Sequence, residues 1–339
     1  MVDATHKSFP ASDRSYFAIL KKEVHGWAVA NDFDKKRIGE LDIVLAEMTS
    51  NLHKYANDGE VLAAVFREEE NTYIELICID SGPGMTDIVR MTTDGYSSGK
   101  TMGHGLGSIK RLSDHAEIFS QQGWGTIVLS RIYKTPPPAK AARIELLIKA
   151  LVVAKPGEQV SGDGYCLKTT RGITKLLIAD GLGHGPDANL AINEAAKIFR
   201  RCPEDSPVEI LRDINREVRK TRGLVATIAS FDLKNKNIRI AGIGNISSRF
   251  TSPALSKNCL AYNGIVGHNI PNTMNDQVID PKVYNQLVMC SDGIRSRWDT
   301  NRVPGIQRSD LSIQAAAIYK DYARKTDDMS VIIAKFSVV

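Results

Sequence analysis

The chain has 339 residues, a formal net charge of +5 and 42% hydrophobic residues, which is enough for two domains with separate apolar cores. Its five cysteines are widely spaced and form no Cys-x-x-Cys pair, so we expect a cytoplasmic protein with neither a disulfide scaffold nor a zinc site. The basic residues are scattered without interleaved aromatic residues, and no apolar stretch is long enough to cross a bilayer. We therefore expect neither nucleic acid nor a membrane as a partner.

The first half of the chain reads as two helices followed by strands. Residues 12–30 begin with Ser and Asp, which favour a helix N-terminus. The second helix is indicated by apolar residues at steps of three and four, namely Ile38, Leu41, Leu45, Met48, Leu52 and Tyr55. The other elements predicted here are a strand hairpin over 60–80, a polar flap over 86–101, a helix opened by glycines at 103–107, and strands at 116–121 and 125–133.

Several groups on these elements suit a nucleotide. Asp80, at the end of a buried strand, can accept a hydrogen bond from an exocyclic amine such as that of adenine, and glycines at 82 and 84 let a ring approach the backbone. Asn51 offers an oxygen to Mg²⁺, and Glu47, one turn earlier on the same helix, can accept a proton from an attacking hydroxyl. The N–H groups of residues 105–107 at a helix start can hold phosphates.

The ordered set of Glu-x-x-x-Asn, Asp-x-Gly-x-Gly, a flap, Gly-x-Gly-x-Gly and Gly125-Thr126 resembles the GHKL (Bergerat-fold) ATPases over residues 10–133. Residues 103–126, GHGLGSIKRLSDHAEIFSQQGWGT, are similar to the stressosome (RsbT-type) serine kinases of bacterial partner-switching pathways. The resemblance implies ATP with Mg²⁺, where Asn51 holds Mg²⁺, Asp80 reads adenine and Glu47 is the general base. It also implies nucleotide contacts from Gly82, Gly84, Gly103, Gly105, Leu106, Gly107, Thr126 near adenine, and Lys54 near phosphate.

Two other activities remain open for this half. Histidine kinases share the same boxes, but they also need a dimerising helical hairpin with a phosphoacceptor histidine, and too few residues precede Glu47 to form one. His25 lies in that stretch, and we interpret it as an ordinary helix residue. The other alternative is an anti-sigma-like module that binds a partner in an ATP-dependent way without phosphorylating it.

A proline-rich stretch separates the two halves. Pro136, Pro137 and Pro138 cannot continue a helix or a central strand, and they favour a short stiff spacer. We therefore predict an ATP-binding kinase domain over 1–134, a linker over 135–142 and a second domain over 143–339.

Carboxylates at strand ends dominate the second half. Apolar strands end at Asp180 and Asp292, and Asp327 and Asp328 stand just before a third strand. If Arg171 and Gly172 form a two-residue hairpin turn, Asp163 faces Asp180 across the antiparallel pair. Bare carboxylates this close repel each other unless a cation holds them, and an all-Asp set suits Mg²⁺ or Mn²⁺ better than zinc.

The motifs SGDGY, ADGLGHG, AGIGN, CSDGI and DDMS resemble the SpoIIE-like branch of the PPM-type metal-dependent protein phosphatases over about residues 143–337. The resemblance implies two Mn²⁺ or Mg²⁺ ions that Asp180 bridges, with ligands also from the Gly181 carbonyl, Asp292 and Asp327. Asp163 then orients the attacking water, and Asp328 supports a ligand. His184 either faces the phosphate or settles the loop-to-helix turn. The phosphate-binding arginine of the eukaryotic branch has no evident counterpart near the domain start.

Together the two halves predict an α+β protein of two domains. The first is a Bergerat-type α/β sandwich with one mixed sheet, and the second is a PPM-type β-sandwich flanked by helices, with helical content at 186–200 and 206–221. We expect a cytoplasmic bacterial protein with both kinase and phosphatase activities. Its predicted substrate is a Ser or Thr of a STAS-type anti-sigma antagonist or a similar phosphoprotein. A sigma factor is a further candidate partner. A degenerate phosphatase used as a scaffold is disfavoured by the complete Asp set.

Overall fold

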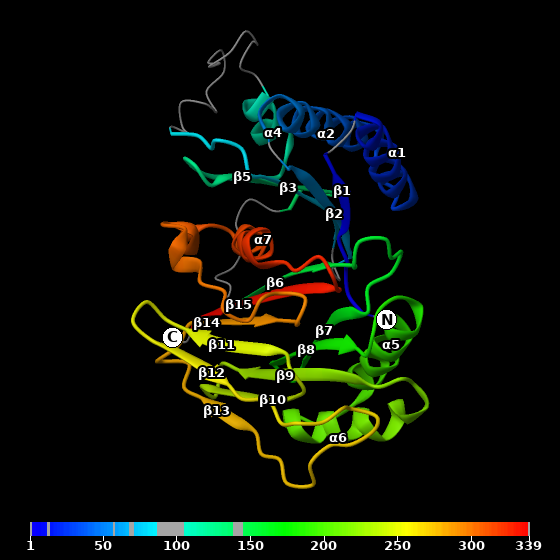
Figure 1. Cartoon of the computed structure of the whole chain (residues 1–339), viewed down its shortest axis with the longest axis vertical. Helices are drawn as coiled ribbons and strands as arrows, with labels where there is room; N and C mark the ends of the chain where they lie inside the picture. The colour runs from blue at the N-terminus through cyan, green and yellow to red at the C-terminus, as the bar shows by residue number, and fades with distance from the viewer. Residues whose placement is uncertain are drawn as a thin grey trace. The chain divides into compact units, whose positions relative to one another are not determined.

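The computed structural model describes residues 2–11, 14–56, 58–67, 71–86, 105–137 and 145–337. The chain folds as two compact units, whose elements are labelled in Figure 1. The N-terminal unit contains residues 6–141 and 300–320, and the C-terminal unit contains residues 1–5, 142–299 and 321–339. The chain therefore crosses between the units at four points, whereas the sequence predicts a single linker at 135–142.

A five-stranded sheet forms the centre of the N-terminal unit, in the order β1-β2-β3-β5-β4. Its strands are β1 (Lys7–Pro10), β2 (Glu60–Arg67), β3 (Thr72–Asp80), β4 (His115–Gln121) and β5 (Gly125–Tyr133). One apolar core joins a face of this sheet to the helices α1 (Arg14–Ala30), α2 (Lys35–Tyr55) and α4 (Gly105–Leu112). The helices and strands predicted for this half are all present, and β1 is an edge strand that the sequence analysis did not predict.

All described neighbours in this sheet pair antiparallel, so the prediction of a mixed sheet was wrong. The hairpin of β4 and β5 places β5, rather than β4, next to β3. Strands β3 and β4 run in the same direction, but β5 lies between them. A parallel pair would require those two strands to be neighbours.

Helix α2 carries two of the residues predicted for the nucleotide site, Glu47 and Asn51. Asp34 caps its N-terminus, where the side chain accepts a hydrogen bond from the Arg37 N–H at 2.8 Å. The predicted apolar stripe is buried at Leu41, Leu45, Met48 and Leu52. Tyr55, at the C-terminal end of the stripe, is half exposed instead, because the helix ends there and the chain turns towards β2.

The second face of the sheet holds a polar centre. Since successive side chains of a strand point to opposite faces, Glu75 on β3 and its register partner Arg131 on β5 point away from α1, α2 and α4. Helix α7 (Leu311–Tyr322), preceded by the short 3₁₀ helices η2 (Thr300–Arg302) and η3 (Ile306–Arg308), contributes the groups that meet them. Residues 311–319 of α7 are all buried. The sequence analysis missed this helix.

Two five-stranded antiparallel sheets form the C-terminal unit and enclose one apolar core between them. The first sheet has the order β13-β10-β9-β8-β7, and the second has the order β12-β11-β14-β15-β6. The strands are β6 (Leu146–Val153), β7 (Asp163–Thr170), β8 (Ile173–Gly181), β9 (Leu224–Asp232), β10 (Asn237–Ile243), β11 (Ser247–Thr251), β12 (Ser256–Cys259), β13 (Gln277–Ile279), β14 (Gln286–Cys290) and β15 (Met329–Phe336). The predicted β-sandwich is confirmed.

Helices α5 (Pro186–Arg201) and α6 (Pro207–Glu217) cover the outer face of the first sheet through a second apolar core, as Figure 1 shows. The 3₁₀ helix η1 (Val218–Lys220) continues α6. Ser206 caps α6 by accepting a hydrogen bond from the Glu209 N–H, and proline stands in the first turn of both α5 and α6. These helices correspond to the predicted helical stretches at 186–200 and 206–221.

The structure also bears on membrane insertion. Among the described residues, no helix combines the length and the apolar character that a membrane span requires.

Candidate functional site

The N-terminus of α4 lies against two polar residues of α2. A Cβ atom placed on Gly105 would lie 2.8 Å from the Glu47 carboxylate oxygen Oε2 and 3.5 Å from Asn51 Oδ1. The first backbone N–H groups of α4, which have no partner within the helix, therefore start beside a carboxylate and an amide oxygen. N–H groups at a helix start favour phosphate, and an amide oxygen suits Mg²⁺, so this corner of the unit fits a metal-bound phosphate chain.

Asp80 ends β3 at the same end of the sheet. One of its carboxylate oxygens accepts a hydrogen bond from the Gly82 N–H at 2.7 Å, and Thr126 on β5 is its register partner. Burial raises the pKa of Asp80, while the N–H groups of Gly82 and Thr126 and the positive charge of Lys320 act in the opposite direction. A half-buried carboxylate fixed in this way can read an exocyclic amine through a charge-assisted hydrogen bond.

Close backbone contacts around Asp80 explain the glycines that the sequence analysis selected. A Cβ on Gly82 would lie 2.5 Å from the Tyr55 carbonyl oxygen, and a Cβ on Gly84, which has φ +72°, would lie 2.0 Å from the Gln121 carbonyl oxygen. The Ser120 hydroxyl accepts from the Met85 N–H at 2.8 Å and lies 2.9 Å from Thr126 Oγ1. The loop after β3 is thus fastened to the β4–β5 hairpin.

The structure brings most of the predicted nucleotide residues to this end of the N-terminal unit. Leu106 packs partly into the core below α4, and Gly107 is buried. Lys54 is exposed on the last turn of α2. Gly103 and most of the predicted flap lie outside the described residues.

In the C-terminal unit, the strands pair in the register that the hairpin arithmetic predicts. Asp163 on β7 lies directly opposite Asp180 on β8, with Arg171 and Gly172 in the turn at φ +55° and +78°. Asp163 is almost fully buried, and it accepts hydrogen bonds from the hydroxyls of Ser330, at 2.8 Å, and Ser291. Two serines on β15 and after β14 therefore fix a carboxylate of β7.

The electrostatics show that the predicted carboxylates form one group. Burial raises the pKa of Asp180, and the negative charges of Asp163, Asp292, Asp327 and Asp328 raise it further. Burial likewise raises the pKa of Asp163. Among the described residues, no three His, Cys, Asp or Glu side chains converge closely enough to ligate one ion, so the structure supplies the proximity of the charges rather than a coordination shell. This oxygen-only cluster, buried at Asp163 and Asp328 and exposed at Asp292, fits divalent Mg²⁺ or Mn²⁺ in its donor chemistry.

Asp328 supports the loop before β7. Its two carboxylate oxygens accept hydrogen bonds from the Lys155 and Gly162 N–H groups, both at 2.8 Å, and its own N–H donates to Asp327 Oδ1 at 2.9 Å. A Cβ on Gly162 would lie 2.7 Å from the Asp328 carboxylate. Asp328 thus positions the loop that carries Asp163, whereas Asp327 is the member of the pair predicted to bind metal.

Two residues near the carboxylates were missed by the sequence analysis. Asn245, the last residue of the AGIGN motif, donates a hydrogen bond from Nδ2 to Asp292 Oδ2 at 2.9 Å. Arg222 donates from Nη1 to the Leu182 carbonyl oxygen at 3.1 Å, and its Nη2 lies 3.2 Å from Asp187. Its guanidinium therefore lies along the loop that follows Asp180. The sequence signal for Asn245 was its motif, whereas Arg222 had no local signal.

His184 has a structural role in this loop. Its Nδ1 lies 2.6 Å from Glu158 Oε1, and the glycines on either side adopt positive φ values of +80° and +75°. Both features hold the turn between β8 and α5, in agreement with the second of its two predicted roles.

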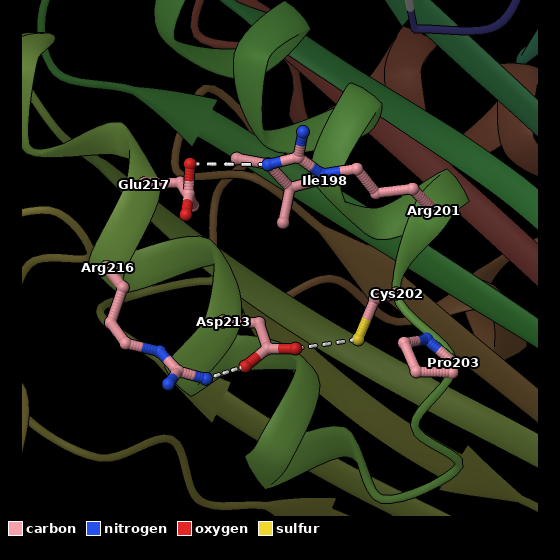
Figure 2. Close-up of a pocket in the computed structure, with 7 residues that line it drawn as sticks. All are labelled: Ile198, Arg201, Cys202, Pro203, Asp213, Arg216 and Glu217. Atoms are coloured by element: carbon pink, nitrogen blue, oxygen red, sulfur yellow. Dashed lines mark hydrogen bonds and ion pairs between the residues drawn. The ribbon is translucent and has the colours of Figure 1, made fainter.

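A separate pocket of about 360 Å³ lies between α5 and α6 (Figure 2). Its lining residues are Ile198, Arg201, Cys202, Pro203, Asp213, Arg216 and Glu217, and none of them belongs to the predicted sites. Asp213 accepts a hydrogen bond from the Cys202 thiol and pairs with Arg216, and Arg201 pairs with Glu217. Burial, followed by the hydrogen bond to Asp213, raises the pKa of the Cys202 thiol to about 11, which disfavours a nucleophilic thiolate.

Comparisons with known proteins match the two halves of the chain to two different families. Residues 9–131 match the family of histidine kinase-like ATPase domains, and residues 170–337 match the family of stage II sporulation protein E (SpoIIE). The serine/threonine-protein kinase RsbT of Bacillus subtilis (strain 168) is 32% identical over 86 residues. The match spans 25% of this chain and 65% of RsbT, so the chain matches less than two thirds of that relative.

Solved structures resemble more than half of the chain. A chain from work on the bacterial stressosome as a modular system adapted to control secondary messenger signalling is 28% identical, with a TM-score of 0.52 over 57% of this chain and all of that chain. RsbX in complex with magnesium is 18% identical, with a TM-score of 0.49 over 58% of this chain and 98% of that chain.

Proposed function

Because the chain joins a histidine kinase-like ATPase domain to a SpoIIE domain, we propose that it both phosphorylates and dephosphorylates a protein in a bacterial partner-switching pathway. The observation that carries the proposal is the separation of two different sites in two units. The N–H groups at the start of α4 lie beside Glu47 and Asn51 in one unit, and a carboxylate cluster lies around Asp180 in the other. The first site suits an anionic phosphate chain, and the second site suits divalent cations.

In the kinase half, each residue acts through the contacts described above. Asp80 accepts the adenine amine, the N–H groups of Gly105, Leu106 and Gly107 hold phosphate oxygens, and Asn51 supplies an oxygen to Mg²⁺. Glu47, beside the helix start, accepts the proton of the attacking Ser or Thr hydroxyl. Thr126, fixed by Ser120, and the glycines at 82 and 84 shape the adenine wall, and Gly103 and Lys54 complete the proposed set.

In the phosphatase half, the carbonyl of Gly181 and the carboxylates of Asp180, Asp292 and Asp327 would hold two Mn²⁺ or Mg²⁺ ions. These ions would supply Lewis-acid activation of the phosphate and an acidified water. Asp163, held by Ser330 and Ser291, orients the water, and Asn245 positions Asp292.

The proposed domains are an ATP-binding kinase domain over 1–134, a linker over 135–142 and a phosphatase domain over 143–339. In the structure, residues 1–5 belong to the C-terminal unit, and residues 300–320 belong to the N-terminal unit. The proposed substrate is Ser or Thr of a STAS-type anti-sigma antagonist, and a sigma factor is a further candidate. We place the protein in the cytoplasm, which is supported by the five cysteines, all free and four of them buried.

The test uses the full chain and one STAS-type protein from the same genome. Incubation with radiolabelled ATP and Mg²⁺ should label the STAS-type protein on Ser or Thr, and subsequent removal of ATP and addition of Mn²⁺ should release the label as inorganic phosphate. If ATP binds but no tested partner is labelled, the first half is an ATP-dependent binding module. If label survives Mn²⁺ on every phosphoprotein tested, the phosphatase assignment is wrong.

A further inference from the structure

The segment Thr300–Lys320 lies in the N-terminal unit although two residues of the proposed metal centre bracket it in the sequence. Asp292 precedes the point where the chain leaves the C-terminal unit, and Asp327 follows the point where it returns at Asp321. Both carboxylates belong to the metal centre proposed above. The segment is therefore inserted between two ligands of that centre and packs with the nucleotide-binding sheet.

Buried polar groups attach the start of α7 to this sheet. The Arg131 guanidinium donates to both carboxylate oxygens of Asp310, at 2.8 and 2.7 Å, and to Glu75 Oε2 at 2.6 Å. The Ser312 hydroxyl also donates to Glu75, at 3.0 Å. Glu75 and Arg131 are almost fully buried, and His6 Nε2 lies 3.2 Å from Glu75. Removing the segment would deprive the buried Arg131 guanidinium of Asp310 and the buried Glu75 carboxylate of the Ser312 hydroxyl, so this contact is specific.

The other end of α7 reaches the nucleotide end of the same sheet. The Lys320 ammonium lies 4.3 Å from the centre of the Trp124 ring, in the hairpin turn directly before Gly125 and Thr126. Its charge also acts on Asp80, where it favours the ionised carboxylate that accepts the adenine amine. The Tyr319 hydroxyl donates to Glu60 Oε2 at 3.2 Å, at the start of β2. Lys320 therefore acts on the nucleotide site through Asp80 and Trp124.

Beyond Lys320, backbone contacts join the end of α7 to the residues around the proposed metal ligands. The Arg295 N–H donates to the Tyr322 carbonyl oxygen at 2.9 Å, and the Arg324 N–H donates to the Gly293 carbonyl oxygen at 2.8 Å. Ile294 and Ala323 form an antiparallel bridge between these bonds. The stretch directly after Asp292 is thus hydrogen-bonded to the stretch that leads into Asp327.

We propose that Lys320 is a positioning residue of the nucleotide site and that the segment Thr300–Lys320 couples nucleotide binding to the metal centre. The inference rests on the proposed function. The state with Lys320 in place binds nucleotide more tightly because the Lys320 charge favours the ionised Asp80 carboxylate and its contact with the Trp124 ring fixes the hairpin turn. The same state keeps the stretch after Asp292 hydrogen-bonded to the stretch that leads into Asp327. Nucleotide and metal therefore favour one state, and each raises the affinity for the other.

The experiment measures hydrolysis of p-nitrophenyl phosphate by the full-length protein across a range of free Mn²⁺, with and without a non-hydrolysable ATP analogue. The analogue should lower the half-saturating free Mn²⁺ of the wild type by at least about fivefold, the lower end of typical coupling between sites. In Lys320→Met the ratio of the two half-saturating values should fall to about one, and the analogue should bind more weakly in calorimetry. Lys320→Arg, which keeps the cation over the ring, should restore the ratio.

Lys234→Met is the matched control, because Lys234 is exposed in the turn between β9 and β10. It should keep the wild-type ratio. If the wild type binds the analogue and hydrolyses the ester but shows a ratio of one, the inference is wrong while the proposed function stands. If Lys320→Met keeps the wild-type ratio, Lys320 has no coupling role. If the wild type lacks either binding or hydrolysis, the proposed function fails, and the inference fails with it.

Discussion

The two sites of this protein differ in the charge that the fold itself supplies. Around Asn51 the chain offers unpaired helix N–H groups, and the one strand-end carboxylate there, Asp80, is partly compensated by two N–H groups and Lys320. Around Asp180 the chain gathers four further Asp carboxylates, and burial together with their negative charges disfavours the ionised form of Asp180. The first site therefore carries little uncompensated negative charge, whereas the negative charge of the second is unfavourable until cations bind.

This difference predicts where a single neutral substitution has the largest effect. Asp180→Asn should abolish Mn²⁺-dependent hydrolysis of p-nitrophenyl phosphate, on the order of a thousandfold or more, because an amide cannot replace a carboxylate that bridges two ions. ATP binding, measured by calorimetry on the same preparation, should persist. Full hydrolysis in Asp180→Asn would mean that the carboxylate cluster is not the metal centre.

The converse substitution removes the proposed base at the nucleotide site. Glu47→Ala should lower phosphorylation of the partner by roughly 10²–10⁴-fold, the range typical of a lost general base, while phosphatase activity persists. Transfer of radiolabel from ATP measures the first activity, and ester hydrolysis measures the second. Loss of both in a folded protein would contradict the assignment of Glu47 to the kinase reaction alone.

A third substitution tests the buried ion pair on the second face of the sheet. Asp310→Asn should destabilise the protein by about 3 kcal/mol in urea unfolding, because Arg131 loses a bidentate carboxylate in a buried site and keeps Glu75 and the Ser312 hydroxyl. Asp42→Asn, which breaks the exposed pair with His25, should cost less than about 1 kcal/mol and serves as the control.

The same ion pair predicts a pH dependence of known sign. The hydrogen bonds from His115 and Arg131 and the positive charge of Arg131 lower the pKa of Asp310 in the folded state, although burial alone would raise it. Its stabilising contribution is thus complete above the unfolded pKa of about 4 and is lost as the pH falls towards the folded pKa. The stability difference between wild type and Asp310→Asn should therefore be constant near neutral pH and shrink below about pH 4. A constant difference down to pH 2 would contradict the lowered pKa.

The smallest effect is expected from a single methyl group in the adenine wall. Gly82→Ala would place a Cβ 2.5 Å from the backbone oxygen of Tyr55, and the strain of about 1–3 kcal/mol should weaken ATP binding on the order of tenfold. Gly39→Ala, on α2 with nothing within 4 Å of its Cβ position, is the matched control and should leave the affinity unchanged. Equal affinities for both variants would place the nucleotide away from Gly82.

The sequence by itself predicted the features that depend on residues close together along the chain. The α2 stripe predicted its buried face from Leu41 to Leu52, because the helical period alone fixes which residues share a side. The facing pair of Asp163 and Asp180 followed from a two-residue turn, since a short turn fixes the register of both strands. Gly82 and Gly105 were selected for ligand contacts, and the structure places each where a Cβ would lie within 3 Å of another group of the protein, the Tyr55 carbonyl oxygen and the Glu47 carboxylate respectively.

Only the tertiary structure decided the features that join distant parts of the chain. Strand order in the first sheet depends on long-range pairing, so the local pattern could not exclude a parallel pair. The contact of Asn245 with Asp292 spans 47 residues, and that of Arg131 with Asp310 spans 179. Periodicity identifies apolar faces but not their partners, and it gives no signal for a polar side chain whose partner is distant in sequence. For this reason α7 and its attachment to the nucleotide-binding sheet emerged from the structure alone.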